Sequence, residues 1–217
     1  MAFFASKRNQ VITALAALFV VYSGATMTVV EEGQEAALTG EVVFDPTTAA
    51  TNFWQNNSPK YFEDKAVPLT TILSEAQGDF SKIASKYGRY SMGDSGELSF
   101  IVKGSGTINV VKNKLRSGYL GITLDDYSGS EQIRLQIGPV FKGSAVRDTI
   151  DLISYKDYKN QIEWAQVSVA LHNLITSEVL GPIDMATTEG KKVEFVGCFT
   201  VARANQILVT PVELKIN

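Results

Sequence analysis

Apolar and polar residues alternate along three segments in the middle of the chain, 98–110, 120–124 and 133–137. A period of two residues is typical of a strand with one buried face, so this pattern predicts three strands. The turn-rich sequence DDYSGS separates the second strand from the third, and Gly104 and Gly106 stand where the first strand can bend sharply. The three segments together predict an antiparallel meander.

The period then lengthens to that of a helix. Between residues 158 and 179 the apolar side chains recur every three or four positions, which predicts a helix with one buried stripe, and Gly181-Pro182 ends it. Two more alternating runs, 193–201 and 208–214, predict a closing pair of strands. Three strands, a helix and two strands form the element order of a five-stranded Greek-key barrel of the oligonucleotide/oligosaccharide-binding (OB) type.

The sequence therefore predicts a mainly β protein with some α structure, in which an OB-like barrel domain occupies residues 96–217 and carries a helix between its third and fourth strands. A small β-sandwich is the alternative. Residues 31–95 are interpreted as a linker and a helical appendage, with helices near 46–55, 69–77 and 80–87.

Residues 1–30 are interpreted as a membrane-targeting segment. Lys7 and Arg8 precede an apolar run from Val11 to Tyr22, and small residues follow it. This order fits a secretory signal peptide that is cleaved after Ala25, and it equally fits an uncleaved transmembrane anchor if the run extends further. Both interpretations place the rest of the chain outside the cytoplasm.

Composition and charge narrow the classes of function. Apolar residues make up 45% and charged residues 20%, with a net charge of −3, so the chain has no basic field for holding nucleic acid. Cys198 is the only cysteine and His172 the only histidine, which excludes an intrachain disulfide and the usual zinc sites. Cys198 lies in an apolar run, which predicts a buried thiol. No nucleophile motif or phosphate-binding glycine pattern occurs, so we predict no catalytic residue, metal or cofactor.

One polar cluster does stand out. Arg147 and Asp148 follow the third predicted strand, and Asn160, Gln161 and Glu163 open the predicted long helix. These side chains can hydrogen-bond a carboxylate or a sugar hydroxyl, and an arginine offers a planar fork of donors. They can equally well bond the backbone or one another, in which case the cluster has only a structural role.

Several motifs resemble those of one bacterial family. They are FDP at 44–46, Trp54, KAVPL at 65–69, YGR at 87–89, VKGSG at 102–106, RSGYL at 116–120, LQIGPVFKGSAVRD at 135–148, NQIEWAQVSVAL at 160–171 and ILVTPVEL at 207–214. In this order they are similar to the predicted periplasmic lipoproteins called domain of unknown function 2291. The resemblance adds Gln136 to the five candidate ligand-binding residues, because it lies in one of the most recognisable motifs. The chain departs from the lipoprotein pattern because no cysteine follows its apolar run.

The resemblance implies a periplasmic, membrane-associated protein without an established activity, whose relatives are often encoded near sugar-uptake transporters. Three hypotheses follow. The first is a non-enzymatic binding or accessory module that is held at the inner membrane by its N-terminal helix and serves an ABC sugar transporter. The second is a structural protein of the envelope that binds no small ligand. The third is a hydrolase with Asp148 or Glu163 as general base.

Overall fold

The computed structural model describes residues 7–26 and 45–217, and it divides the chain into two units, Met1–Phe44 and Asp45–Asn217. The first unit contains α1 (Lys7–Thr26). Within the described ranges, no helix is both long enough and apolar enough to cross a membrane. The membrane-targeting segment predicted at residues 1–30 lies partly outside the described residues and stays a prediction. The short linker predicted at residues 31–35 lies wholly outside them.

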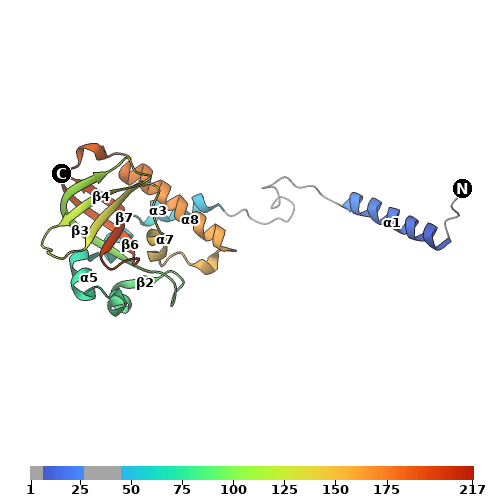
Figure 1. Cartoon of the computed structure of the whole chain (residues 1–217), viewed down its shortest axis with the longest axis horizontal. Helices are drawn as coiled ribbons and strands as arrows, with labels where there is room; N and C mark the ends of the chain where they lie inside the picture. Colours follow the sequence, from blue (N-terminus) through green and yellow to red (C-terminus); the bar gives the residue numbers. More distant parts are fainter. Residues whose placement is uncertain (1–6, 27–44) are drawn as a thin grey trace. The chain divides into compact units, whose positions relative to one another are not determined.

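Five strands of the second unit close into a barrel (Figure 1): β3 (Leu98–Lys112), β4 (Ser117–Leu124), β5 (Gln132–Pro139), β6 (Lys192–Thr200) and β7 (Gln206–Ile216). β3, β4 and β5 form the predicted antiparallel meander. β6 and β7 form the predicted antiparallel pair. Closure comes from parallel pairing of β5 with β7 and antiparallel pairing of β3 with β6. The OB-like barrel is thus confirmed.

The long strand β3 uses both of its edges. One edge pairs with β6 along residues 99–107. The other edge pairs with three strands in succession, β2 (Gly88–Tyr90) at residues 98–100, β1 (Val67–Pro68) at 102–103 and β4 at 106–112. Several of these β3 residues therefore pair with a strand on each side. Gly106 lets β4 approach closely at the bend, since an added Cβ would lie 2.3 Å from the Thr123 carbonyl oxygen.

Aromatic rings fill one end of the barrel. Phe100 of β3 and Phe199 of β6 are stacked with their centroids 5.4 Å apart, and both are fully buried. Phe80 packs against both rings, at 5.9 and 5.7 Å, from a helical turn outside the barrel. Fully burying a side chain of this kind stabilises a fold by roughly 1.5–3 kcal/mol. The turn that carries Phe80 is therefore part of the barrel's core.

Short helices precede the barrel in the chain and pack on it or on α8. They are α3 (Pro46–Asn57), α4 (Lys60–Lys65), α5 (Leu69–Ala76), η1 (Phe80–Ile83) and α6 (Ala84–Tyr87). Asp45 caps α3 as predicted, since its Oδ1 accepts a hydrogen bond of 2.9 Å from the Thr47 amide. Leu69 and Ile72 of α5 are fully buried. The predicted helical appendage from Asp45 onward lies in one compact unit with the barrel, Asp45–Asn217.

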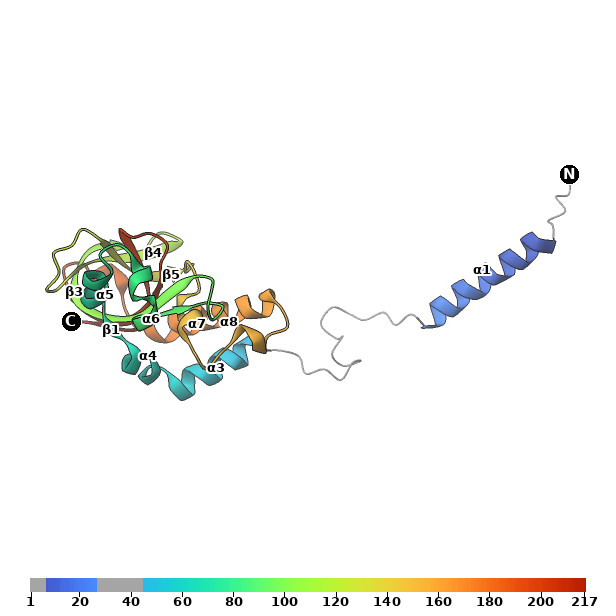
Figure 2. The same ribbon diagram turned by 90° about the horizontal axis from the view of Figure 1, so that it is seen from below.

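The chain between β5 and β6 is also helical. It forms α7 (Ala145–Thr149), η2 (Tyr155–Asp157), α8 (Gln161–Leu174), η3 (Ile175–Leu180) and η4 (Met185–Thr187). α8 packs beside α3, and the two lie next to each other in both ribbon views (Figures 1 and 2). α8 begins after its cap Asn160 and passes directly into the π-helical η3, so the predicted helix starts a few residues later than expected. The short helix α7 has no counterpart in the prediction.

Candidate functional site

A cavity of about 250 Å³ lies where α7, α8 and the turn after β2 meet. Arg147 and Asp148 line it from α7, and Trp164 lines it from α8. Arg89 of β2 and Tyr155 of η2 complete its charged and aromatic wall. Four elements and the turn after β2 therefore bring two guanidinium groups, two carboxylates (Asp94 and Asp148) and two aromatic rings to one small space.

Arg147 and Asp148 form a buried ion pair in this wall. The Arg147 Nε and Nη2 atoms donate to the Asp148 Oδ1 atom at 2.8 and 2.6 Å, and the two side chains are only 9% and 1% exposed. The remaining Nη1 atom donates to the Trp164 carbonyl oxygen at 3.0 Å. The Arg147 guanidinium also lies over the Trp164 ring, 4.2 Å from its centroid. Arg147 is thus fixed by two kinds of contact, and it holds α7 against α8.

The second carboxylate oxygen of Asp148 is different. Its Oδ2 atom is buried and accepts no hydrogen bond from the described residues. Burial raises the pKa of Asp148, and the adjacent Arg147 guanidinium opposes that shift. A buried oxygen without a donor costs a fold roughly 1–3 kcal/mol. This uncompensated acceptor is the chemical feature that sets the cavity apart from an ordinary buried ion pair.

Gln136 lies elsewhere and is satisfied by the protein. It lies on β5 and is 2% exposed. Its Nε2 atom donates to the Lys142 carbonyl oxygen at 3.1 Å and to Thr210 Oγ1 at 2.8 Å. Its Oε1 atom accepts from the Lys142 amide at 2.7 Å. Gln136 therefore does not line the cavity, and its hydrogen bonds hold the loop after β5 in place.

Asn160, Gln161 and Glu163 also lie apart from the cavity lining, at the start of α8. The Asn160 Oδ1 atom accepts from the Ile162 and Glu163 amides, both at 2.9 Å, which makes Asn160 the helix cap. Glu163 accepts from the Lys159 amide at 2.9 Å and so bonds the chain just before the helix. Gln161 is exposed. Of the six candidates, only Arg147 and Asp148 line the cavity.

Arg89, Tyr155 and Trp164 are the lining residues that sequence reasoning missed. Arg89 ends the YGR motif and Trp164 lies within NQIEWAQVSVAL. Both motifs therefore contained a lining residue that was not among the six candidates. Tyr155 gave no signal in the sequence. Its ring lies edge-on to that of Trp164, with centroids 6.1 Å apart.

His172 lies on α8, close enough to Arg147 for the guanidinium charge to affect its pKa. Its ring is stacked on Phe141, with centroids 4.7 Å apart, and its Nε2 atom is buried without a partner among the described residues. Burial, with a further contribution from the Arg147 charge, lowers the pKa of His172 to about 4. His172 is therefore neutral at pH 7 and is part of the packing.

Cys198 is buried in β6, as predicted. Its Sγ atom accepts a hydrogen bond of 3.2 Å from Thr149 Oγ1 of α7. Burial raises the pKa of the Cys198 thiol to about 12, so the thiolate form is scarce at neutral pH.

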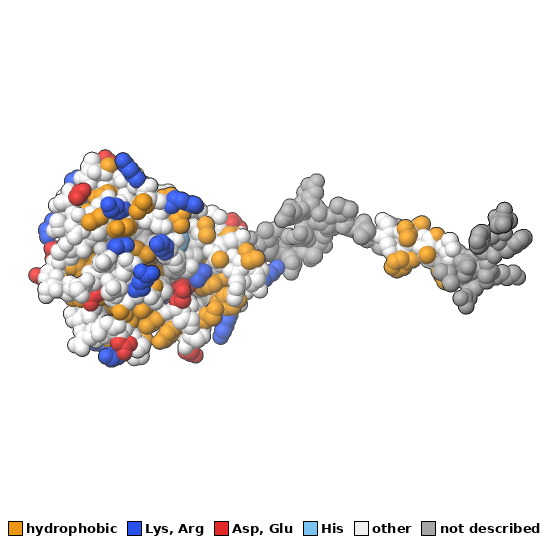
Figure 3. Space-filling view, viewed as in Figure 1, with side chains coloured by type: hydrophobic (Ala, Val, Ile, Leu, Met, Phe, Trp, Pro, Cys, Tyr) orange, Lys and Arg blue, Asp and Glu red, His pale blue; other side chains and the backbone are white. Residues whose placement is uncertain are grey.

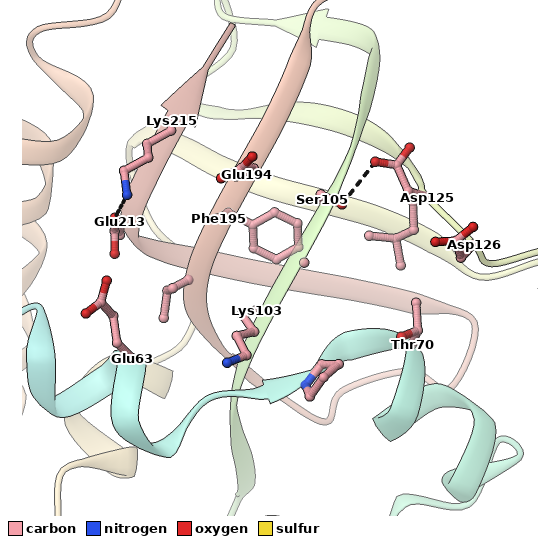
Figure 4. Close-up of a pocket in the computed structure, with 14 residues that line it drawn as sticks. Glu63, Thr70, Lys103, Ser105, Asp125, Asp126, Glu194, Phe195, Glu213 and Lys215 are labelled. Carbon is pink, nitrogen blue, oxygen red and sulfur yellow. Dashed lines mark hydrogen bonds and ion pairs between the residues drawn. The ribbon is translucent and has the colours of Figure 1, made fainter.

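A second cavity, of about 490 Å³, lies against the outer faces of β3, β6 and β7 (Figure 4). The carboxylates of Glu63 and Glu213 lie next to each other on one side of it, and Lys215 Nζ bonds Glu213 Oε1 at 2.5 Å. A hydrogen bond with Glu213 raises the pKa of Glu63, whereas Lys215 lowers the pKa of Glu213. The two carboxyl groups therefore share one proton more readily than isolated ones would. None of the six candidate residues lines this cavity.

Comparison with known proteins gives two findings. The model of a family described as "predicted periplasmic lipoprotein (DUF2291)" matches residues 15–215. An OB-fold protein from Thermotoga maritima has a similar crystal structure, with a TM-score of 0.63 and 18% sequence identity over 81% of this chain and 100% of that one. No curated protein matches the chain. At this level of identity the Thermotoga maritima structure supports the OB fold alone.

Proposed function

Because the chain belongs to the predicted periplasmic lipoprotein family DUF2291, we propose that it is a non-enzymatic periplasmic protein that binds a small polar ligand. The observation that carries the proposal is that Asp148, which lines the 250 Å³ cavity, has a buried Oδ2 atom without a hydrogen-bond donor among the described residues. A ligand hydroxyl or ammonium group that donates to this oxygen would offset its desolvation. We place the protein at the membrane, as an accessory to a sugar-uptake ABC transporter.

The chemistry of the wall favours a hydroxylated ligand of about the size of one sugar ring. At about 250 Å³ the cavity is smaller than the sites that hold drug-sized molecules. Asp148 supplies an acceptor, and Arg89, which also lines the cavity, supplies donors. The rings of Tyr155 and Trp164 offer apolar surface for the faces of a sugar. A sugar ring presents both of these polar and apolar surfaces to its site.

The test is a ligand screen with a matched pair of variants. The full chain is titrated with a panel of monosaccharides, and binding is followed by the rise in melting temperature and by calorimetry. We expect one or more sugars to stabilise the wild-type protein and Asp148→Asn to lose that response at least tenfold in Kd. The control Asp64→Asn changes an exposed carboxylate in the same way and should bind as wild type does.

A response that is unchanged in Asp148→Asn would remove Asp148 from the proposed site. The absence of any response across the panel would favour the structural hypothesis instead. That hypothesis has its own support, because Gln136 and Asn160 spend their hydrogen bonds within the protein.

A further inference from the structure

The barrel carries a cationic loop pair at one end, made of the β3–β4 hairpin and the loop that follows β5. Residues 112–117 and 138–144 contain Lys112, Lys114, Arg116 and Lys142 and no Asp or Glu, although the whole chain has a net charge of −3. All four side chains are exposed. None of the four forms a salt bridge within the part of the chain that the structure describes.

Two apolar side chains stand among these cations. Leu115 lies at the tip of the hairpin between Lys114 and Arg116 and is 52% exposed. Val140 of the second loop is 40% exposed. Its amide donates to the Arg116 carbonyl oxygen at 2.9 Å, so the two apolar residues belong to adjoining loops. Figure 3 shows that Lys and Arg side chains gather over the barrel on the face turned to the viewer.

The two loops are held as one rigid piece. Gly118 brings their backbones together, since an added Cβ would lie 2.8 Å from the Gly138 carbonyl oxygen and 2.9 Å from that of Lys112. Gly138 itself has φ of +64°, which a residue with a side chain rarely adopts. The buried amide of Gln136 bonds the Lys142 backbone in both directions. The motif residue Gln136, which does not line the cavity, thus fixes the position of a cation in the loop pair.

We propose that the cationic loop pair docks on a membrane surface that contains anionic phospholipid. Exposed lysines and arginines are attracted to anionic headgroups, and each one near the surface strengthens binding about fivefold. An apolar side chain between them can enter the boundary between headgroups and acyl chains. Leu115 has this position, with Lys112, Lys114 and Arg116 beside it on the same hairpin. A purely electrostatic partner, such as an acidic protein, would leave the exposed Leu115 and Val140 without a role.

The test uses the full chain with an environment-sensitive dye at residue 115, introduced by Leu115→Cys. Cys198 is buried, so the wild-type protein should take up no dye and serves as the labelling control. The labelled chain is mixed with vesicles of phosphatidylethanolamine and phosphatidylglycerol, or with vesicles of phosphatidylcholine alone. We expect a blue shift of the dye only with the anionic vesicles, and we expect 0.5 M salt to reverse it.

Two triple variants test the charges. Lys112→Gln/Lys114→Gln/Arg116→Gln should lower the ratio of docked to free dye roughly a hundredfold, since three cations are removed. Lys60→Gln/Lys82→Gln/Lys86→Gln makes the same charge change on exposed residues of the helices and should dock as the parent does. A second dye position, Leu152→Cys, is 62% exposed outside the loops and should not shift.

Three results would overturn the proposal. They are an equal shift with phosphatidylcholine, no shift with either vesicle, and a shift that survives the hairpin variant. Because the dye reports the surroundings of residue 115, attachment of the chain through its N-terminal segment does not by itself produce the signal. The outcome is also independent of the sugar screen, since none of the loop residues lines the 250 Å³ cavity.

Discussion

The two cavities hold their carboxylates in opposite ways. Asp148 is almost completely buried and paired with Arg147, and burial is the main cause of its raised pKa. Glu63 is exposed, and a second carboxylate, Glu213, is the main cause of its raised pKa. Each cavity also has a carboxylate with one buried oxygen that is unpaired among the described residues, Asp148 Oδ2 and Glu213 Oε2. They differ in the partner cation, because Arg147 is 9% exposed and Lys215 is 63% exposed, so water screens only the second pair well. For this reason we propose the ligand site in the smaller cavity.

The sharpest test of this contrast is the removal of each cation. Arg147→Ala leaves Asp148 buried without its partner, and we expect a loss of roughly 3–5 kcal/mol in the free energy of unfolding. Lys215→Ala removes the exposed partner of the partly buried Glu213, and its effect should be smaller. Urea denaturation of both variants measures the difference. Equal losses would show that Asp148 depends on Arg147 no more than Glu213 depends on Lys215.

A second test uses the titration of His172, in the buried region around Arg147. The pKa of His172 is lowered to about 4 in the folded chain, so the unfolded chain binds the proton more readily between about pH 6.5 and pH 4. Stability should therefore fall as the pH drops through this range, by about 1–3 kcal/mol from this group. His172→Phe keeps an aromatic ring against Phe141 and should remove that part of the slope. Thermal melts at pH 7, 5.5 and 4.5 compare the two proteins, and identical slopes would contradict the buried neutral histidine.

The smallest effect is expected at the exposed pair, and with the opposite sign. The raised pKa of Glu63 means that the folded chain binds its proton more readily than the unfolded chain does. The contribution of Glu63 to stability should therefore rise as the pH falls toward the ordinary glutamate value. Glu63→Gln should remove this dependence and stabilise the protein slightly at pH 7. The same series of melts measures it, and a variant that is less stable at pH 7 would argue that Glu63 has a favourable partner.

The fold was largely predictable because its signals are local. The alternation along β3, β4 and β5, the helical period of α8 and the cap at Asp45 each occur within a few consecutive residues. The helix α7 was not predictable, since five residues are too few to show a period. The packing of the N-terminal helices on the barrel was not predictable either. It depends on the contact of Phe80 with Phe100 and Phe199, which only the folded chain brings together.

The candidate site was predictable only in part. Of the candidate ligand-binding residues, Arg147 and Asp148 line the cavity, whereas Asn160 and Glu163 have the residue types and spacing of an ordinary helix cap. Nothing in the sequence alone separates a cap from a ligand-binding group. Arg89 reaches the cavity from β2, nearly sixty residues before Arg147, and that approach follows from the pairing of β2 with β3. The order of residues in the sequence does not indicate that Arg89 and Arg147 line the same cavity.

The two-sided pairing of β3 has a consequence for how the polypeptide matures. β2, β1 and β4 lie within about thirty residues of β3 along the chain, so one edge of that strand can be covered by nearby segments. Its other edge pairs only with residues 192–200, which lie about eighty residues after β3 in the sequence. Until that pairing forms, the chain presents a row of unsatisfied amides and carbonyls, which is a template for unwanted pairing between molecules. A truncated chain that ends before β6 should therefore be prone to aggregate.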